Sequence, residues 1–267
     1  MVNTLILGSL IFNYISEQLF LTVISLISNF LSALAGGGAG LIQLPALILL
    51  GLPFTKALVT HKIASVALGF GASFRHYKEK NLDLKLSLLI LLFGIPGVII
   101  GAKVVVFLPE TIATFTLGIL ILSLGIYSYK PNNKRIKEKK IFSKNLNKIK
   151  GGLVITLIGI LNGSLTSGTG LFLTLWLVKY FKFSYTKAVA HTLVIVGLAW
   201  NGSGAILLAL NNEVKWSWLA SLIMGSLIGG YLGAHFSIIK GDRVVKKSFE
   251  ILTILMGSSL IIKATLT

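Results

Sequence analysis

The sequence predicts an all-α polytopic membrane protein built from two inverted repeats, with about eight to ten membrane segments. Composition is the first observation behind this: mean hydropathy is +0.87 and 12% of residues are charged, against about 25% in a soluble protein. Length is the second, because several apolar stretches reach the roughly 20 residues that cross a bilayer as a helix. The third is that motifs of the first half return in the second half in the same order.

Residues 1–18 are expected to form an N-terminal extension, such as a helix at the membrane interface. Their apolar run has neither the basic start nor the small-residue cleavage site of a signal peptide. Residues 19–129 form the predicted first transmembrane repeat, which begins with a helix over Leu19–Ala35.

A glycine cluster, AGGGAGLIQLP (Ala35–Pro45), follows this helix. Glycine costs about 1 kcal/mol relative to alanine inside a helix, so the cluster predicts a break. The next apolar segment, Leu41–Leu52, would be only about 17 Å long as a helix, which is half a bilayer. We therefore expect a half-helix that starts within the membrane, followed by three long apolar helices.

Residues 130–150 form a basic loop with nine Lys or Arg and one acidic residue. Short loops rich in Lys and Arg stay in the cytoplasm, where anionic headgroups explain the charge. The net charge of +17 therefore does not predict nucleic-acid binding, since no groove-reading motif accompanies it. The chain has no cysteine, which excludes disulfides and thiolate metal sites.

Residues 151–267 form the second transmembrane repeat, with a first helix over Gly151–Leu165 and a short segment over Leu171–Phe181. Three motif pairs relate the halves: GGGAGL (Gly36–Leu41) and TSGTGL (Thr166–Leu171), TKALVTHK (Thr55–Lys62) and TKAVAHT (Thr186–Thr192), GIPGVIIGAK (Gly94–Lys103) and GSLIGGYLGAH (Gly225–His235). Three segments are basic: Arg75–Lys85, Lys130–Lys150 and Lys240–Lys247. All three lie on the cytoplasmic side only if the two halves have opposite orientations in the membrane. Transporters of that architecture bind substrate between the repeats, near the midplane.

The two breaks are the predicted binding site. A helix that begins within the membrane leaves its first N–H groups unpaired, and these groups together with the helix dipole attract anions. The candidate residues are Gly36, Gly37, Gly38 and Gly40 in the first half, and Asn162, Ser164, Thr166, Ser167, Gly168, Thr169 and Gly170 in the second. Close helix packing is the alternative, and it is the preferred interpretation for Gly97, Gly101, Gly225, Gly229 and Gly233.

Ionisable residues within apolar stretches are few, so each is informative. His61 and His191 occupy near-equivalent repeat positions, where they could donate to an anion or titrate in a proton-coupled cycle; interfacial histidines are the alternative. A metal site is not expected, because no carboxylate or third histidine is near them. Trp200 and Asn201 are expected to line the cavity, and no cofactor is implied.

The duplicated glycine-rich breaks, each followed by TKA and a GxxGxxxGA helix, resemble the TauE/SafE sulfite exporter family. The resemblance covers about residues 20–265. It implies a multi-pass permease of the bacterial inner membrane that moves sulfite, sulfonates or related organosulfur anions, usually outward. The second break, Thr-Ser-Gly-Thr-Gly, departs from the family's more glycine-rich form.

A passive anion channel and a permease for a carboxylate remain alternatives, and a homodimer is compatible with this interpretation. An enzyme is not expected, because the eight acidic residues lie mostly in loops.

Overall fold

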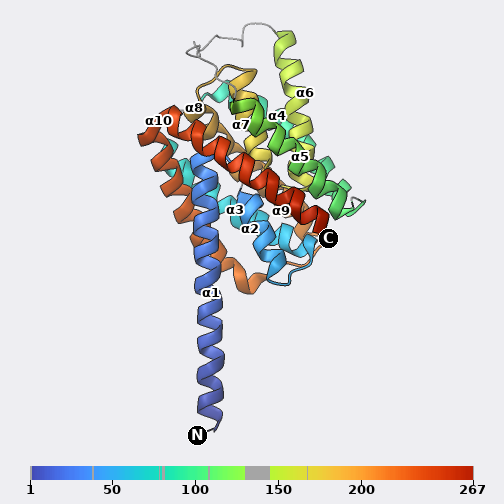
Figure 1. The fold of residues 1–267 in the computed structure, drawn as a ribbon. Coiled ribbons are helices and arrows are strands. Elements are labelled where there is room, and N and C mark those ends of the chain that lie inside the picture. Colours follow the sequence, from blue (N-terminus) through green and yellow to red (C-terminus); the bar gives the residue numbers. More distant parts are fainter. Residues whose placement is uncertain are drawn as a thin grey trace.

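The computed structural model describes residues 2–37, 39–77, 79, 82–107, 109–129, 145–166 and 168–266. Throughout this part of the chain the regular structure is helical (Figure 1). The first half contains α1 (Val2–Ala35), α2 (Ala39–Leu49), α3 (Phe54–Tyr77), α4 (Leu84–Val104), the 3₁₀ turn η1 (Val105–Phe107) and α5 (Glu110–Tyr129). The second half contains α6 (Asn145–Ser164), α7 (Thr169–Lys179), α8 (Tyr185–His191), the π-helix η3 (Thr192–Trp200), α9 (Asn201–Ala209) and α10 (Trp216–Leu266).

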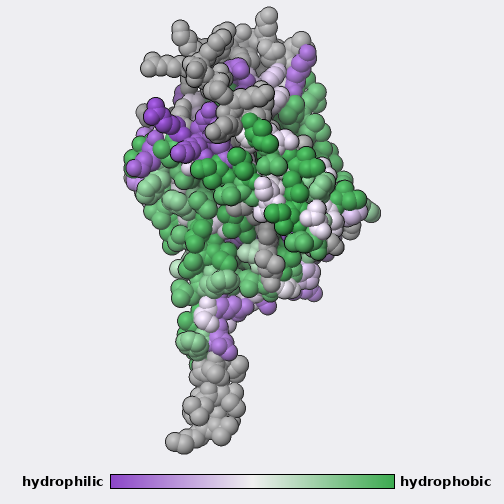
Figure 2. Space-filling view, in the orientation of Figure 1, coloured by the Kyte–Doolittle hydropathy of each residue, from purple (hydrophilic) through white to green (hydrophobic). Residues whose placement is uncertain are grey.

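Six helices of the described chain are long and apolar enough to cross a membrane: Ile11–Ala35, Phe54–Tyr77, Leu84–Val104, Tyr185–Ala209, Trp216–Gly241 and Arg243–Leu266. The last two are the parts of α10, which bends at Gly241, where φ is 69°. Many large apolar side chains remain exposed on these helices. On the face that Figure 2 shows, apolar residues cover the middle of the molecule, and hydrophilic residues gather above and below them. The protein is therefore an all-α polytopic membrane protein, as its sequence predicts.

The first helix is longer than expected. It starts at Val2 rather than at Leu19 and projects beyond the bundle as one continuous rod (Figure 1). Residues 2–18 contain no proline and a single glycine, Gly8, so nothing in them terminates a helix. The predicted basic loop lies outside the described residues up to residue 144, and α6 begins at Asn145.

Both predicted breaks are present, and each is followed by a half-length helix. Gly36 and Gly37 have φ of 93° and 107°, and the second break contains Thr166 and Gly168 at 62° and 74°. These left-handed conformations end the preceding helix, and glycine adopts them without steric cost. α2 and α7 have 11 residues each, so each spans about 17 Å at 1.5 Å per residue.

The halves pack on each other reciprocally: α6 lies against α4, and α1 lies against the first part of α10. Glycines make this close approach possible. A methyl group at Gly97 would collide with the carbonyl oxygen of Thr156, and one at Gly225 would lie 2.5 Å from that of Thr22. The packing role predicted for these glycines is confirmed, as small residues let helices approach closely within a membrane.

Candidate functional site

The two helix breaks touch each other in the interior of the molecule. A methyl group at Gly37 would lie 2.7 Å from Cα of Gly170, and one at Gly170 would lie 2.8 Å from Cα of Gly37. The hydroxyl of Thr174 on α7 donates to the carbonyl oxygen of Gly36 at 2.7 Å and so joins the second half to the first break. This contact brings the starting ends of α2 and α7 into one place.

A cavity of about 40 Å³ lies beside this contact. Eight of the predicted site residues line it: Gly37, Gly40, His61, Asn162, Thr166, Thr169, Gly170 and Asn201. Ser32, Ser65 and Thr192 add hydroxyl groups that sequence reasoning missed, and Leu68, Leu193 and Val196 supply apolar wall. Among the described residues that line the cavity there is no Asp or Glu, so its polar lining consists of hydroxyl, amide, imidazole and backbone groups.

Five predicted residues do not line the cavity: Gly36, Ser164, Gly168, His191 and Trp200. Ser164 donates its hydroxyl to the carbonyl oxygen of Ile160 at 2.9 Å, within its own helix. Trp200 is fully buried and packs against Gly94, where a methyl group would collide with the indole ring. Gly38 and Ser167 lie outside the described residues.

The start of α7 meets the cavity at a glycine. Its N-cap residue is Gly168, in the left-handed conformation, which has no side chain to cap the first turn. Thr169 and Gly170, the first residues of the helix, line the cavity. The first N–H groups of a helix lack partners within the helix and carry the positive end of its dipole. An anion in the cavity would therefore meet a favourable backbone field.

His61 is held by two polar neighbours at the cavity wall. Its Nδ1 hydrogen-bonds to Oε1 of Gln43 on α2, and its Nε2 lies 3.2 Å from the hydroxyl of Ser65. The amide of Gln43 is oriented by donating to Oγ of Ser25 at 2.8 Å. Since Oε1 is an acceptor, the geometry assigns the proton to Nδ1 and leaves Nε2 to accept from Ser65.

His191 lies away from the cavity and ties two elements together. Its Nδ1 donates to the carbonyl oxygen of Lys187 at 2.8 Å, and its Nε2 accepts from the backbone N–H of Asp83 at 2.8 Å. Asp83 precedes α4, so the imidazole links α8 to the loop between α3 and α4. The structure places His61 at the cavity and His191 away from it, where His191 joins α8 to the loop before α4.

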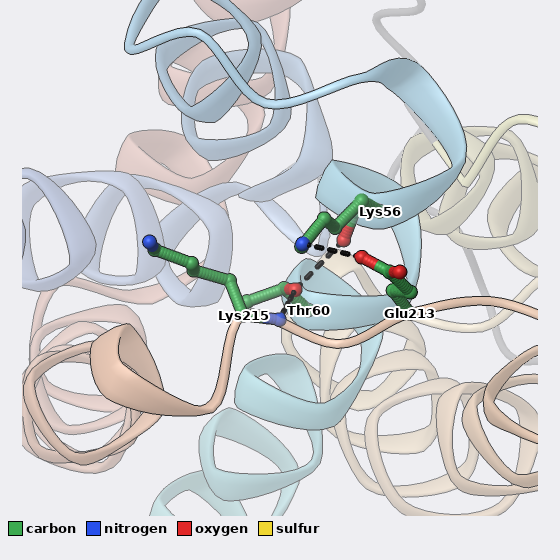
Figure 3. A network of polar contacts seen from close by, with 4 residues as sticks. All are labelled: Lys56, Thr60, Glu213 and Lys215. Atoms are coloured by element: carbon green, nitrogen blue, oxygen red, sulfur yellow. Dashed lines mark hydrogen bonds and ion pairs between the residues drawn. The ribbon is translucent and has the colours of Figure 1, made fainter.

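Thr60 makes the matching contacts in the first half (Figure 3). Its hydroxyl donates to the carbonyl oxygen of Lys56 at 2.7 Å and accepts from the backbone N–H of Lys215 at 3.0 Å. Lys215 precedes α10, as Asp83 precedes α4. Extending the TKA motifs in register places Thr60 opposite His191 and His61 opposite Thr192. Thr192 is thus the repeat counterpart of His61. Alignment of the two TKA motifs is the sequence signal that could have predicted Thr192 as a cavity residue.

An amide network runs from the cavity to a buried lysine. The side-chain amide of Asn162 donates to Oγ1 of Thr169 at 2.9 Å and lies 3.5 Å from Oδ1 of Asn201. Nζ of Lys62 donates to the backbone oxygen of Asn162 at 2.8 Å and to its Oδ1 at 3.3 Å. Lys62 is 0% exposed. Sequence reasoning missed this residue, although a lysine within an apolar span is itself a signal of function.

Comparison with known proteins gives consistent matches over nearly the whole chain. The family model described as "Sulfite exporter TauE/SafE" matches residues 19–260. A "Probable membrane transporter protein" of Haemophilus influenzae is 26% identical over 239 residues, covering 89% of this chain and 92% of that protein. The "Probable membrane transporter protein YfcA" of Escherichia coli K12 is 25% identical over 263 residues, covering 98% and 91%. The "Probable membrane transporter protein YdhB" of Bacillus subtilis is 27% identical over 240 residues, covering 88% and 96%. No solved structure matches.

Proposed function

Because the chain belongs to the sulfite exporter TauE/SafE family, we propose that it is a secondary transporter that exports sulfite, a sulfonate or a related small organosulfur anion. It is a multi-pass protein of the bacterial inner membrane, as its helices and its relatives indicate. The proposed substrate site is the cavity where the two breaks meet, at the interface of the two halves.

The observation that carries the proposal is the chemistry of this cavity. The start of α7, whose N-cap residue is a glycine, enters it, and the lining that the structure describes has amides and hydroxyls but no carboxylate. Transporter sites of this kind use the positive ends of half-helices to hold an anionic group. A cation would meet the wrong end of the dipole and find no acidic partner there.

The volume of the cavity limits the size of the substrate that it can hold. Since about 10–15 Å³ of such space admits one water, 40 Å³ holds roughly three. That room suits a compact oxyanion such as sulfite, and longer sulfonates require the walls to move apart. A small site between two halves also fits alternating access, in which one repeat rocks against the other. The inverted arrangement of the repeats is part of this proposal.

Ligand-induced stabilisation of the purified protein tests the substrate class. The screen contains sulfite, methanesulfonate, thiosulfate, sulfate, taurine, sulfoacetate and matched carboxylates. A ligand that binds only the folded state at a hundred times its Kd adds about 2.7 kcal/mol to the free energy of unfolding. Stabilisation by organosulfur anions and not by carboxylates supports the proposal. Stabilisation by cations or neutral solutes alone, with every anion silent, contradicts it.

Flux through reconstituted vesicles tests the transport mode. A transporter gives saturable sulfite movement that an imposed pH gradient drives uphill, whereas a channel gives ohmic conductance in a planar bilayer. Inside-out and right-side-out vesicles then distinguish export from import. Ohmic conductance would replace the transporter by a passive anion channel.

A further inference from the structure

We propose that Lys62 is the proton carrier of the transport cycle, neutral while the cavity is empty and protonated when an anion occupies it, so that anion and proton cross together, outward when the anion gradient exceeds the opposing proton gradient. This inference rests on the proposed function, because it needs an anion in the cavity. It concerns the coupling ion, and the residues that carry it are Lys62, Asn162 and His61.

The two hydrogen bonds of Lys62 can both be made by a neutral amine. Its nitrogen donates to two oxygens, both from Asn162, at 2.8 and 3.3 Å. A neutral amine has two N–H groups to donate, whereas an ammonium has three. Gly204 of α9 leaves just enough room for the side chain, since a methyl group there would lie 3.2 Å from Nζ. The nitrogen is thus enclosed between α6 and α9, with its two bonds on the α6 side.

A permanent charge at this place would be costly. Lys62 is 0% exposed, and it lies within the membrane-length helix Phe54–Tyr77. Ion pairs of the described residues join Lys56 to Glu213, Arg75 to Glu79 and Lys246 to Glu250, and none of them includes Lys62. An uncompensated buried ion costs several kcal/mol. The charge therefore needs a partner that arrives from outside the protein.

The cavity is where that partner would arrive. Asn162 lines the cavity and accepts both bonds of Lys62, so one residue separates the amine from the proposed anion site. An anion there attracts the ammonium in a medium of low dielectric, where opposite charges interact more strongly than in water. Binding thereby favours protonation of the amine, and the proton comes from water on the side to which the site is open. Release of the anion reverses both steps.

Comparison with the groups that surround it favours Lys62 as the proton carrier. α6 presents Asn162 and α9 presents Gly204, both of them neutral. The titratable neighbour is His61, the preceding residue of α3. Its two ring nitrogens already bond to Gln43 of α2 and to Ser65, and protonation of Nε2 would require the hydroxyl of Ser65 to change from donor to acceptor.

Calorimetry of the full-length protein with methanesulfonate tests the proposal, because this anion does not titrate near neutral pH. The heat of binding is measured in two buffers of different ionisation enthalpy. We expect uptake of about one proton per bound anion, and an affinity that falls roughly tenfold per pH unit on the alkaline side. Binding without proton uptake overturns the role of Lys62 and leaves the proposed function intact. No binding of either methanesulfonate or sulfite overturns both.

Two variants test whether Lys62 is the group that takes up the proton. Lys62→Arg carries a fixed charge, and Lys62→Gln carries none, so either should bind methanesulfonate without the proton that the wild type takes up. The protonation of sulfite itself contributes equally to the measurement on every variant. With sulfite as the ligand, the Lys62 variants should therefore differ from wild type in proton uptake as they do with methanesulfonate. Lys56→Gln is the matched control, since Lys56 pairs with Glu213 away from the cavity, and it should keep wild-type proton uptake. Proton uptake that persists in both Lys62 variants would overturn the assignment.

Discussion

Gly37 and Gly170 are the residues at which the two breaks meet, and neither leaves room for a side chain. Gly37 has two separate constraints. Its φ of 107° disfavours any L-residue, and a Cβ would press on the facing backbone 2.7 Å away. The second constraint is specific to the contact between the halves, so it can be separated from the first by experiment.

Gly37→Ala should destabilise the protein and weaken anion binding more than Gly51→Ala does. Gly51 has a similar φ of 92° but nothing within 4 Å of a new methyl group. Both variants carry the strain of a left-handed alanine, of order 1–3 kcal/mol, and only Gly37→Ala also forces the breaks apart. Thermal unfolding in detergent and sulfite affinity are the measurements. Equal behaviour of the two variants would show that the contact between the breaks is not needed.

The single residues of the cavity could be predicted only in part. The glycines, Asn162, Thr166 and Thr169 follow from the breaks themselves. Residue type pairs His61 with His191, whereas the register of the TKA motif pairs His61 with Thr192. Lys62 was missed because it lies in the same motif as the basic Lys56, and no local pattern tells which lysine faces the interior of a packed bundle.

At the scale of elements, the half-helices were predictable and the π-helix was not. A cluster of glycines followed by a short apolar run predicts a break and a half-length segment, and α2 and α7 confirm it. Residues 192–200 form a π-helix within an unbroken apolar stretch. No residue there signals a π-helix. The segment packs closely on the first half, with Gly197 beside Gly69 and Trp200 beside Gly94.

Gly94→Ala should unfold at a clearly lower temperature than wild type. The added methyl group would collide with the ring of Trp200, which is fully buried and has no space to retreat. Overpacking of this kind costs about 1–3 kcal/mol. Gly202→Ala is the control on α9, because its nearest atom would be 4.0 Å away; it should be neutral or more stable by up to about 1 kcal/mol. A wild-type melting temperature for Gly94→Ala would show that Trp200 is loosely held.

The loop between α9 and α10 is tied to α3 by an ion pair whose contribution should depend on pH. The hydrogen bond from Lys56 lowers the pKa of the Glu213 carboxyl below its ordinary value of 4.5. A lowered pKa in the folded state stabilises the protein above pH 4.5, and this stability is lost as the pH falls through the folded-state value. Glu213→Gln should therefore be less stable than wild type at neutral pH and equal to it in acid. At about 1 M salt the neutral-pH difference should shrink; a difference independent of pH and salt would contradict the ion-pair account.

At the scale of the whole molecule, each half packs on helices of the other half and supplies part of the cavity. The first helix of each half packs on the fourth segment of the other half, α1 on α10 and α6 on α4. Neither half could bury its glycine-lined faces alone, and the cavity needs residues from both breaks. The class of fold was predictable from composition and from the length of the apolar stretches. The cavity's shape was not, because it depends on how the two halves are set against each other.

The proposed inverted topology predicts which segments face the cytoplasm. Trp216–Gly241 is long enough to cross the membrane, so Asn211 before it and Arg243 after it should lie on opposite sides. In this cysteine-free chain, Asn211→Cys should react with an impermeant thiol reagent in intact cells, and Arg243→Cys should react only after the cells are opened. Labelling of Arg243→Cys from outside would reverse the orientation, and labelling of both residues from one side would contradict the crossing.

The most direct test of the anion site is the sulfite affinity of Asn162→Asp. This substitution keeps the size of the side chain but places a carboxylate in the cavity wall, next to Lys62 and Thr169. The carboxylate would both repel an anion and pair with the lysine, so the variant should fold and lose sulfite binding. Asn211→Asp adds the same charge at an exposed loop position and should bind like wild type. Wild-type sulfite affinity in Asn162→Asp would contradict the claim that the anion binds where the two breaks meet.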